Sequence, residues 1–407
     1  MGNEDPHAED PGARRLKQTN WLAVWAVFLA GLAAAGYIGK VPPLLPMLRG
    51  DLGLTLTQSG FIATMLNVMG ALVGMFAGVF ADRYGHKRYA LAGLALLVAG
   101  GLGGAASQGF ALLLVSRFVE GAGFIMTTVS GVALIANVTR PEDRPRAMAL
   151  WSAYMPTGGA LALLAAPLAV AAIGWRGFWV ATAAVAAVAL LMVVRVVPSP
   201  AFGSRVRAGR LATESLTHRG GLALCLAFFG YASMWATVMI WLPTFAVDQR
   251  GVTAAAAAVL TVGMVAINIP GNLAGGWLMG RGFSRASLIV SAGSVQAVCC
   301  VGMFLDVMPD AARYAACLVF SLVGGLIPMA VLSGVPIHAR THAHIGTANG
   351  MVMQTSQLGQ FTAPVAVAAI AASHGWQASL PVMLFLAACA IAGGVAIGRI
   401  ELSRPAP

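Results

Sequence analysis

Three charged side chains lie within long apolar segments, where a charge could bind an ion, hold a proton or pair with another charge. They are Lys40, Arg117 and Glu120. A charged group surrounded by hydrocarbon is costly, so it is a candidate for function by default. Arg117 and Glu120 are three positions apart, which places them on one face of a helix and lets them form an ion pair.

Lys40 and Arg117 each have more than one interpretation. The Lys40 side chain is long enough to snorkel to a nearby polar interface; otherwise it is a cation that attracts an anionic solute or pairs with Glu120. Arg117 either faces a solute site or braces Glu120 within one helix. Glu120 is the one carboxylate in the interior of an apolar segment, which makes it the candidate for taking up and releasing a proton.

Uncharged polar and aromatic side chains in other apolar segments could complete a binding site for a small molecule. Some of them will only form hydrogen bonds between helices. The candidates beside Lys40 and Arg117 are Tyr154, Tyr231, Trp235, Trp241, Asn268, Gln354 and Gln357.

The elements that must position these residues follow from composition. Of the 407 residues, 58% are hydrophobic and 10% are charged, and the mean hydropathy is +0.80. Soluble domains carry about 25% charged residues, so the composition excludes a soluble enzyme, a nucleic-acid-binding domain and a disordered protein. Apolar runs long enough to cross a bilayer predict twelve helices. These lie near 21–45, 57–81, 89–107, 110–138, 146–173, 176–197, 220–247, 254–280, 286–305, 312–338, 346–373 and 378–398.

The distribution of charge predicts the domains and the orientation. A polar stretch at 198–219 separates six segments in 21–197 from six in 220–398, with short tails at 1–20 and 399–407. With both tails in the cytoplasm, 19 basic residues fall on the cytoplasmic side and 4 outside, as the positive-inside rule expects. We therefore expect a multi-pass protein of the bacterial cytoplasmic membrane. The net charge of +11 is then a topology signal rather than a nucleic-acid footprint.

An internal repeat relates the two groups of segments at an offset of 201 positions. The matches include Pro42 with Pro243, Asn67 with Asn268, Gly70 with Gly271, Gly74 with Gly275, and Gly174-Trp175 with Gly375-Trp376. Two parallel six-helix halves are a known transporter architecture. The sequence thus predicts an all-α membrane protein with twelve transmembrane helices in two pseudo-symmetric halves.

The loop after the second segment carries a dense motif. Its members are Gly78, Asp82, Arg83, Gly85, Lys87 and Arg88. Gly70, Gly74 and Gly78 recur every four residues, so they allow a second helix to approach closely. Asp82 can accept hydrogen bonds from the N-terminus of a helix in the other half, where backbone N–H groups are unpaired. The basic residues can pair with carboxylates. We expect this motif to act as a conformational latch.

This loop motif resembles the signature of the major facilitator superfamily, and the resemblance extends over the whole chain. A second stretch, from Leu113 to Gly123, resembles a family motif associated with proton coupling, although Glu120 stands where that motif usually has Gln. The resemblance implies a secondary active transporter that moves a small polar or anionic organic solute by alternating access as a proton symporter. In this interpretation Glu120 and Arg117 carry the proton coupling.

Two other functions stay open. Drug–proton antiporters of the superfamily usually carry Gly-Pro-x-x-Gly-Gly in the fifth helix, whereas this chain has Met155-Pro-Thr-Gly-Gly159; a proton-driven efflux pump for drugs or metabolites is therefore the alternative. A membrane sensor that does not transport is the less favoured one. Short Pro- and Gly-containing stretches are loosely similar to bacterial cyanate-type permeases, which favours a small polar or anionic solute.

One histidine group resembles a metal site. His338 and His342 are four positions apart, with Arg340 and His344 nearby, but no Cys or carboxylate accompanies them in the sequence. We interpret them as part of a basic cytoplasmic loop. The sequence has no Walker-type loop and no catalytic set, so it predicts no enzyme, cofactor or metal. The expected partners are a small solute, protons and the lipid bilayer, without nucleic acid, and the chain is expected to be a monomer.

Overall fold

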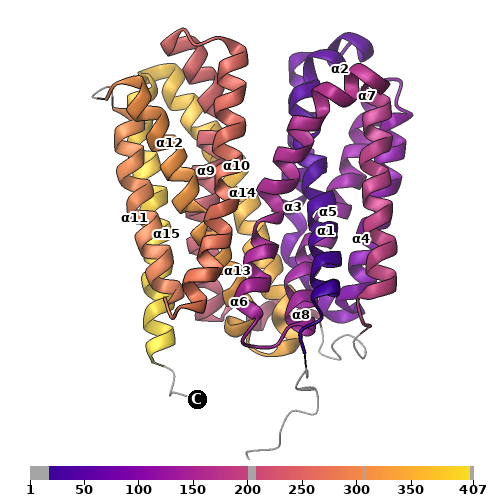
Figure 1. The fold of residues 1–407 in the computed structure, drawn as a ribbon, viewed down its shortest axis with the longest axis vertical. Coiled ribbons are helices and arrows are strands. Elements are labelled where there is room, and N and C mark those ends of the chain that lie inside the picture. Colours follow the sequence, from indigo (N-terminus) through magenta and orange to yellow (C-terminus); the bar gives the residue numbers. More distant parts are fainter. Residues whose placement is uncertain (1–17, 200–207, 306–307, 404–407) are drawn as a thin grey trace, which may run out of the picture.

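The computed structural model describes residues 18–199, 208–305 and 308–403, and over these ranges the chain is helical without any strand (Figure 1). The elements are α1 (Trp21–Gly39), η1 (Pro42–Leu44), α2 (Leu45–Leu52), α3 (Leu56–Tyr84), α4 (His86–Ala105), α5 (Phe110–Val138), α6 (Arg144–Ser152), α7 (Tyr154–Val196), α8 (Ala208–Leu216), α9 (Arg219–Arg250), α10 (Ala254–Gly280), α11 (Arg285–Phe304), α12 (Asp310–Gly324), α13 (Leu326–His338), η2 (His342–His344), α14 (Ile345–His374), η3 (Trp376–Ser379) and α15 (Leu380–Leu402).

Ten helical stretches within the described residues are long and apolar enough to cross a membrane. Their outer walls are apolar too: Leu168, Val259 and Val298 are each more than 70% exposed. A soluble protein rarely leaves such a surface uncovered. The ten are Trp21–Leu44, Phe61–Tyr84, His86–Ala105, Phe110–Val138, Arg144–Val196, Arg219–Leu242, Val259–Gly280, Arg285–Phe304, Asp310–His338 and Trp376–Leu402.

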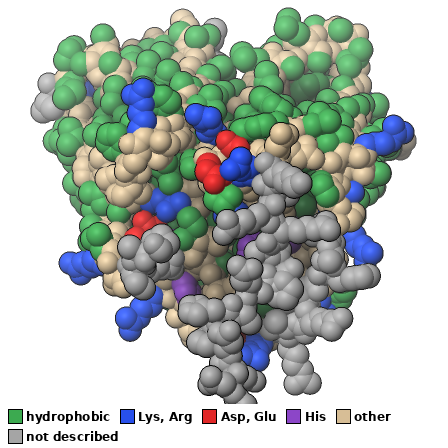
Figure 2. Space-filling view, turned by 60° about the horizontal axis from the view of Figure 1, so that its bottom comes forward, with side chains coloured by type: hydrophobic (Ala, Val, Ile, Leu, Met, Phe, Trp, Pro, Cys, Tyr) green, Lys and Arg blue, Asp and Glu red, His purple; other side chains and the backbone are tan. Residues whose placement is uncertain are grey.

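Two groups of helices meet at one end of the molecule and separate toward the other (Figure 1). We call the end that holds α6, α8 and the described chain ends the terminal end, and the end that holds α2 the opposite end. Lys and Arg side chains surround the terminal end, while hydrophobic side chains cover the walls above it (Figure 2). The molecule therefore has an apolar belt with a basic rim at one end.

Local sequence signals set the helix boundaries. Thr55 and Gln58 form a capping box at the start of α3, since each side chain accepts a hydrogen bond from the other residue's backbone N–H. Gly85 ends α3 with φ of 92°, a left-handed conformation that glycine adopts without a Cβ penalty. Gly174 has φ of 69° and ψ of 171°, so α7 is interrupted at that residue although it spans 43 positions.

The glycine stripe of α3 packs directly on α14. A Cβ at Gly74 would lie 2.8 Å from the Cβ of Gln354, and one at Gly70 would lie 2.6 Å from the Cγ of Gln357. A Cβ at Gly78 would overlap the carbonyl oxygen of Gly346. The absence of side chains at these positions thus lets the two helices approach closely near the terminal end.

Candidate functional site

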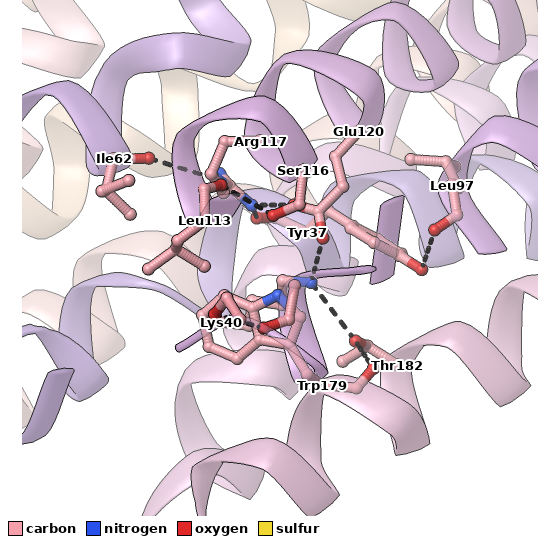
Figure 3. Close-up of polar contacts among 12 residues, drawn as sticks. Tyr37, Lys40, Ile62, Leu97, Leu113, Ser116, Arg117, Glu120, Trp179 and Thr182 are labelled. Carbon is pink, nitrogen blue, oxygen red and sulfur yellow. Dashed lines mark hydrogen bonds and ion pairs between the residues drawn. The ribbon is translucent and has the colours of Figure 1, made fainter. Parts of the chain in front are cut away.

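A fully buried charge cluster lies between α1 and α5 (Figure 3). It consists of Lys40, Arg117 and Glu120, each 0% exposed. The Lys40 Nζ donates to Glu120 Oε1 at 2.8 Å, and Arg117 Nη1 donates to Glu120 Oε2. One carboxylate therefore bridges two cations. This arrangement supplies the opposite charge that burial of each group requires.

Neighbouring groups give both cations further contacts, although Arg117 Nη2 has no hydrogen-bond partner among the described residues. The Lys40 Nζ lies 3.9 Å from the ring centre of Tyr37 and 4.3 Å from that of Trp179, both within cation–π range. The Arg117 guanidinium donates to two backbone carbonyls, Ile62 O at 3.1 Å and Tyr37 O at 3.0 Å. The cluster thus joins the first turn past α1 to α3, α5 and α7.

These contacts decide which interpretation of Lys40 applies. Its amine is sealed inside the helix bundle and pairs with Glu120, so it does not snorkel to a surface. Arg117 braces Glu120 within α5 and also ties α5 to α1 and α3. Neither cation lines the two adjoining cavities between the groups of helices.

A cavity of about 510 Å³ lies between the two groups of helices. This larger cavity is lined by α1, α3 and α7 on one side and by α9, α10 and α14 on the other. A smaller cavity of about 60 Å³ adjoins it and shares Met155, Trp235 and Gln360 with it. A volume of several hundred Å³ is in the usual range for small-molecule sites.

The smaller cavity collects five of the predicted residues. Tyr154, Tyr231, Trp235, Asn268 and Gln357 all line it. Asn268 is held in place because its amide donates to Ser321 O at 2.7 Å and to Tyr231 Oη at 3.2 Å. Trp235 is also fixed, because its indole N–H donates to Ser321 Oγ at 3.1 Å. These side chains therefore form a rigid wall.

Two other predicted residues lie elsewhere. Trp241 borders a separate cavity of about 50 Å³ beside Arg313 and Trp376, and its indole N–H donates to Pro364 O at 2.9 Å. The Gln354 side chain accepts from Met75 N at 3.0 Å and donates to Ala71 O at 2.8 Å. Gln354 thus joins α14 to α3 and is not among the residues that line either of the two adjoining cavities.

Asn67 is a cavity residue that the sequence-based list lacked. It lines the larger cavity from α3, opposite the C-terminal group of helices. A signal was present, since Asn67 matches Asn268 at the repeat offset of 201 positions. Met155 and Thr261, also in the lining, carried no comparable signal.

Asp82 lies at the contact between α3 and the N-terminus of α14. Its Oδ1 accepts from Gly346 N at 2.7 Å, and its Oδ2 accepts from Thr347 N at 2.6 Å and from Thr347 Oγ1 at 2.5 Å. His86 Nε2 lies 3.2 Å from Asp82 Oδ1. A buried carboxylate on unpaired N–H groups at a helix N-terminus is a favourable arrangement.

The basic residues of the same motif make weaker contacts. Lys87 Nζ donates to Val194 O at 3.1 Å, a backbone partner rather than the expected carboxylate. The Arg83 guanidinium lies 5.8 Å from the ring centre of Tyr84. Both Arg83 and Arg88 are exposed at the terminal end.

The short helix α8, inside the predicted central loop, is tied to the start of α14. Glu214 accepts from Arg210 Nε at 2.6 Å and pairs with His344 Nε2 at 3.0 Å and with Arg340 Nε at 3.7 Å. The hydrogen bond from Arg210, together with Arg340 and His344, lowers the pKa of the Glu214 carboxyl against the opposing effect of desolvation.

The structure corrects one sequence-based interpretation, that no carboxylate accompanies the histidines. Glu214 pairs with His344, and Glu401 pairs with His338 at 3.0 Å and with Arg285 at 3.0 Å. Both carboxylates are remote in sequence, so only the fold brings them to the histidines. Among the residues that the structure covers, no three His, Cys, Asp or Glu side chains form a group able to hold a metal.

Comparison with known proteins gives consistent results. The family model of the Major Facilitator Superfamily matches residues 23–364. A probable 4-methylmuconolactone transporter of Cupriavidus pinatubonensis (strain JMP 134 / LMG 1197) is 29% identical over 63% of this chain and 60% of its own length. A hexuronate transporter of Bacillus subtilis (strain 168) is 25% identical over 62% of each chain. The matches thus span about 60% of the length of these relatives.

Solved structures show the same fold. The human organic anion transporter MFSD10 (TETRAN) superposes with a TM-score of 0.78 at 15% identity, covering 93% of this chain and 99% of that one. The E. coli fucose:proton symporter superposes with a TM-score of 0.76 at 16% identity, covering 94% and 98%. The family match covers most of the sequence, and the family consists of transporters rather than enzymes. The chain therefore belongs to the Major Facilitator Superfamily.

Proposed function

We propose that this chain is a secondary active transporter that carries a small organic solute across the membrane by alternating access. The observation that carries the proposal is the larger cavity between the two groups of helices, combined with a tight closure of the same groups by α3 and α14 at the terminal end. A central site closed at one end is what alternation about a fixed site requires.

The proposal includes twelve spans in two six-helix halves, 21–197 and 220–398. The interruption at Gly174 divides α7 into two spans, and α14 has 30 residues, which is long enough to be a further span. The left-handed glycines support the repeat, because Gly174 (φ 69°) and Gly375 (φ 81°) are 201 positions apart and have the same backbone conformation.

The proposed location is the bacterial cytoplasmic membrane, with both termini in the cytoplasm. The basic rim at the terminal end supports this orientation, since cytoplasmic loops carry the excess of Lys and Arg (Figure 2). In that orientation the structure is closed toward the cytoplasm, and the larger cavity lies on the outer side of the α3–α14 closure.

Protons are the proposed source of energy, with Glu120 as the group that binds and releases them and Arg117 as its partner. Glu120 is fully buried and contacts two cations on two helices. A shift of α1 against α5 would change its electrostatic environment and therefore its proton occupancy. The resemblance in fold to a fucose:proton symporter is in keeping with this proposal.

Transport is tested by reconstituting the purified protein into liposomes and measuring flux of 4-methylmuconolactone, glucuronate and fucose, with and without a pH gradient. A cysteine at Ile240, in the cavity wall, reports in parallel which side of the membrane reaches the cavity. We expect solute accumulation that follows the proton gradient and labelling of the cysteine from either side. Uptake driven only by an inside-acid gradient would identify an antiporter, and a cysteine reached from one side alone under all conditions would contradict alternating access.

A further inference from the structure

The two adjoining cavities are lined by uncharged side chains, which is unusual for a site that binds a charged solute. Among the described residues that line them, none is Asp, Glu, Lys, Arg or His. The buried charge cluster is close by, since Gly39 lines the larger cavity, but Lys40 itself is sealed and already paired with Glu120. The site therefore offers a solute no free cation and no free anion.

A carboxylate that entered such a site would lose water without gaining an opposite charge, which is strongly unfavourable. An uncharged solute loses far less on entry. Most of the surface that it would meet is apolar, with Trp235 between the two cavities and Met155, Leu163 and Val265 nearby. The indole of Trp235 has its N–H turned to Ser321, which leaves the apolar ring as its contribution to the wall.

Four side-chain amides line the site. Asn268 donates to Ser321 O and Gln360 donates to Ser356 Oγ, so Asn67 and Gln357 are the two considered as solute contacts. Gln357 is 2% exposed and lines the smaller cavity, and its Oε1 has no hydrogen-bond partner among the described residues. Asn67 lines the larger cavity. A Cβ at Gly70 would touch Gln357. Asn67 lies three positions before Gly70 on the same face of α3, so Asn67 and Gln357 occupy neighbouring turns along the α3–α14 contact.

These amides come from opposite sides of the proposed transport path, α3 and α14. An amide can donate and accept hydrogen bonds, and an unsatisfied buried amide oxygen is costly until a donor reaches it. A solute that satisfied Gln357 and Asn67 together would form hydrogen bonds to both groups of helices at once.

We infer that this site takes an uncharged organic solute with an apolar body and one hydroxyl or carboxamide end that hydrogen-bonds to Asn67 and Gln357. The inference rests on the proposed transport function and names its substrate class. It replaces the small polar or anionic solute expected from sequence with a neutral, partly apolar one.

The test compares amides with the carboxylates of the same skeleton, using the full chain in lipid nanodiscs at pH 7.5 and titration calorimetry. The probes are phenylacetamide with phenylacetate, 3-phenylpropanamide with 3-phenylpropanoate, and cyclohexanecarboxamide with cyclohexanecarboxylate. We expect each amide to bind at least about tenfold more tightly than its carboxylate, because only the carboxylate must be buried as an unpaired charge. Tighter binding of the carboxylates, or binding of neither series at millimolar concentration, would overturn the inference.

Variants assign the binding to the two amides. Gln357→Leu and Asn67→Leu should each weaken amide binding by roughly tenfold, while Gln377→Leu, at an exposed position on η3, should leave it unchanged. Asn67→Lys should reverse the preference toward carboxylates, because it places a cation in the lining. Equal binding by all four variants would also overturn the inference. The labelling of a cysteine at Ile240 does not depend on these probes, so it separates a wrong substrate class from a failure of the transport proposal.

Discussion

At the scale of single residues, the central feature is that the Glu120 carboxylate forms ion pairs with two cations, Lys40 and Arg117. Removing one member of a buried charge network leaves the others without compensation, which usually destabilises a protein by about 3–5 kcal/mol. The Lys40 amine has only Glu120 as an acidic partner among the ion pairs of the described residues. Each residue of the cluster therefore affects folding and, under our proposal, energy coupling.

Glu120→Gln tests the role in coupling, and chemical unfolding in detergent measures its cost in stability, because the neutral amide leaves Lys40 and Arg117 without their counter-charge. The amide preserves shape and one acceptor oxygen but cannot exchange a proton near neutral pH. We expect liposomes with this variant to retain solute exchange across the membrane and to lose accumulation driven by a pH gradient. If the variant still concentrates solute with protons as the only energy source, Glu120 is a structural partner of Arg117 and coupling occurs elsewhere.

Arg117→Ala should impair both exchange and accumulation, because it removes the contacts to Ile62 O and Tyr37 O together with the ion pair. We expect a loss of stability of about 3–5 kcal/mol, measured by chemical unfolding in detergent. Arg176→Ala is the matched control, since its pair with Asp51 is 3.9 Å long and about half exposed, and such pairs contribute about 0–1 kcal/mol. Equal losses for the two variants would contradict a special role for the cluster.

Part of this site could be predicted from sequence, and part could not. The Arg117–Glu120 pair follows from helical spacing alone. The Lys40–Glu120 pair was one of several alternatives, because pairing between α1 and α5 depends on how those helices rotate. The same dependence explains why Gln354 was assigned to a cavity and is found between α3 and α14. Side chains that share a helix face are predictable, whereas the neighbour that this face meets is not.

At the scale of elements, the contact of α3 with α14 is the main closure of the terminal end. Asp82→Asn keeps the shape of the side chain but removes its charge from the α14 N-terminus. Such an interaction contributes about 0.3–1 kcal/mol when exposed and up to about 2 kcal/mol when partly buried. We expect near-normal expression, weaker transport and a shift toward a state open at the terminal end. Unchanged flux and cavity labelling, as expected for the control Asp51→Asn, would show that Asp82 has no role in closing the terminal end.

The helix α8 provides a second contact at the same end. Because the pKa of Glu214 is lowered in the folded state, its contribution to docking is present above the ordinary glutamate pKa of about 4.3. That contribution is lost as the pH falls through the lowered folded value. We expect Glu214→Gln to increase hydrogen exchange across α8 at pH 7, whereas Glu142→Gln, in a pair with Arg140 that is more exposed, should not. Equal exchange in both variants would show that α8 docks without Glu214.

The two contacts differ in how well the sequence predicts them. The glycine stripe and the aspartate at the helix end together indicate a close helix and a helix N-terminus, and both occur in the contact with α14. Glu214 lies 130 positions from His344, within a stretch that its polarity marks as a loop. The amphipathic pattern of this stretch is a local signal for a short helix, but nothing local in the sequence indicates where α8 docks.

At the scale of the whole molecule, hydropathy predicts the helical stretches because a membrane requires long apolar helices. The Gly-Trp repeat at Gly174 and Gly375 also marks real left-handed turns. The cavities are harder to predict, because their lining depends on which few side chains of each helix face the centre. This is why Asn67 appeared only as a repeat match, although it lines the larger cavity.

The orientation of the whole molecule in the membrane can be tested at residues near its two ends. Arg176 pairs with Asp51 in α2, and Asp310 pairs with Arg250 at the end of α9, so both pairs lie at the opposite end with Arg49. Arg146 in α6 and Arg340 beside α8 lie at the terminal end. Of the six positions to be tested, Ser204 lies outside the described residues, and the other five, Arg49, Arg176, Asp310, Arg146 and Arg340, are all exposed.

Single cysteines at these positions, in a chain whose own five cysteines are replaced, should label in two classes. An impermeant maleimide added to intact cells should reach positions 49, 176 and 310, because the positive-inside rule places the less basic end outside. Positions 146, 204 and 340 should react only after the cells are permeabilised. The five described positions are all exposed, so slow reaction there could not be attributed to burial of the side chain inside the protein. Labelling in the reverse pattern would invert the membrane orientation, and the cavity would then be closed toward the outside.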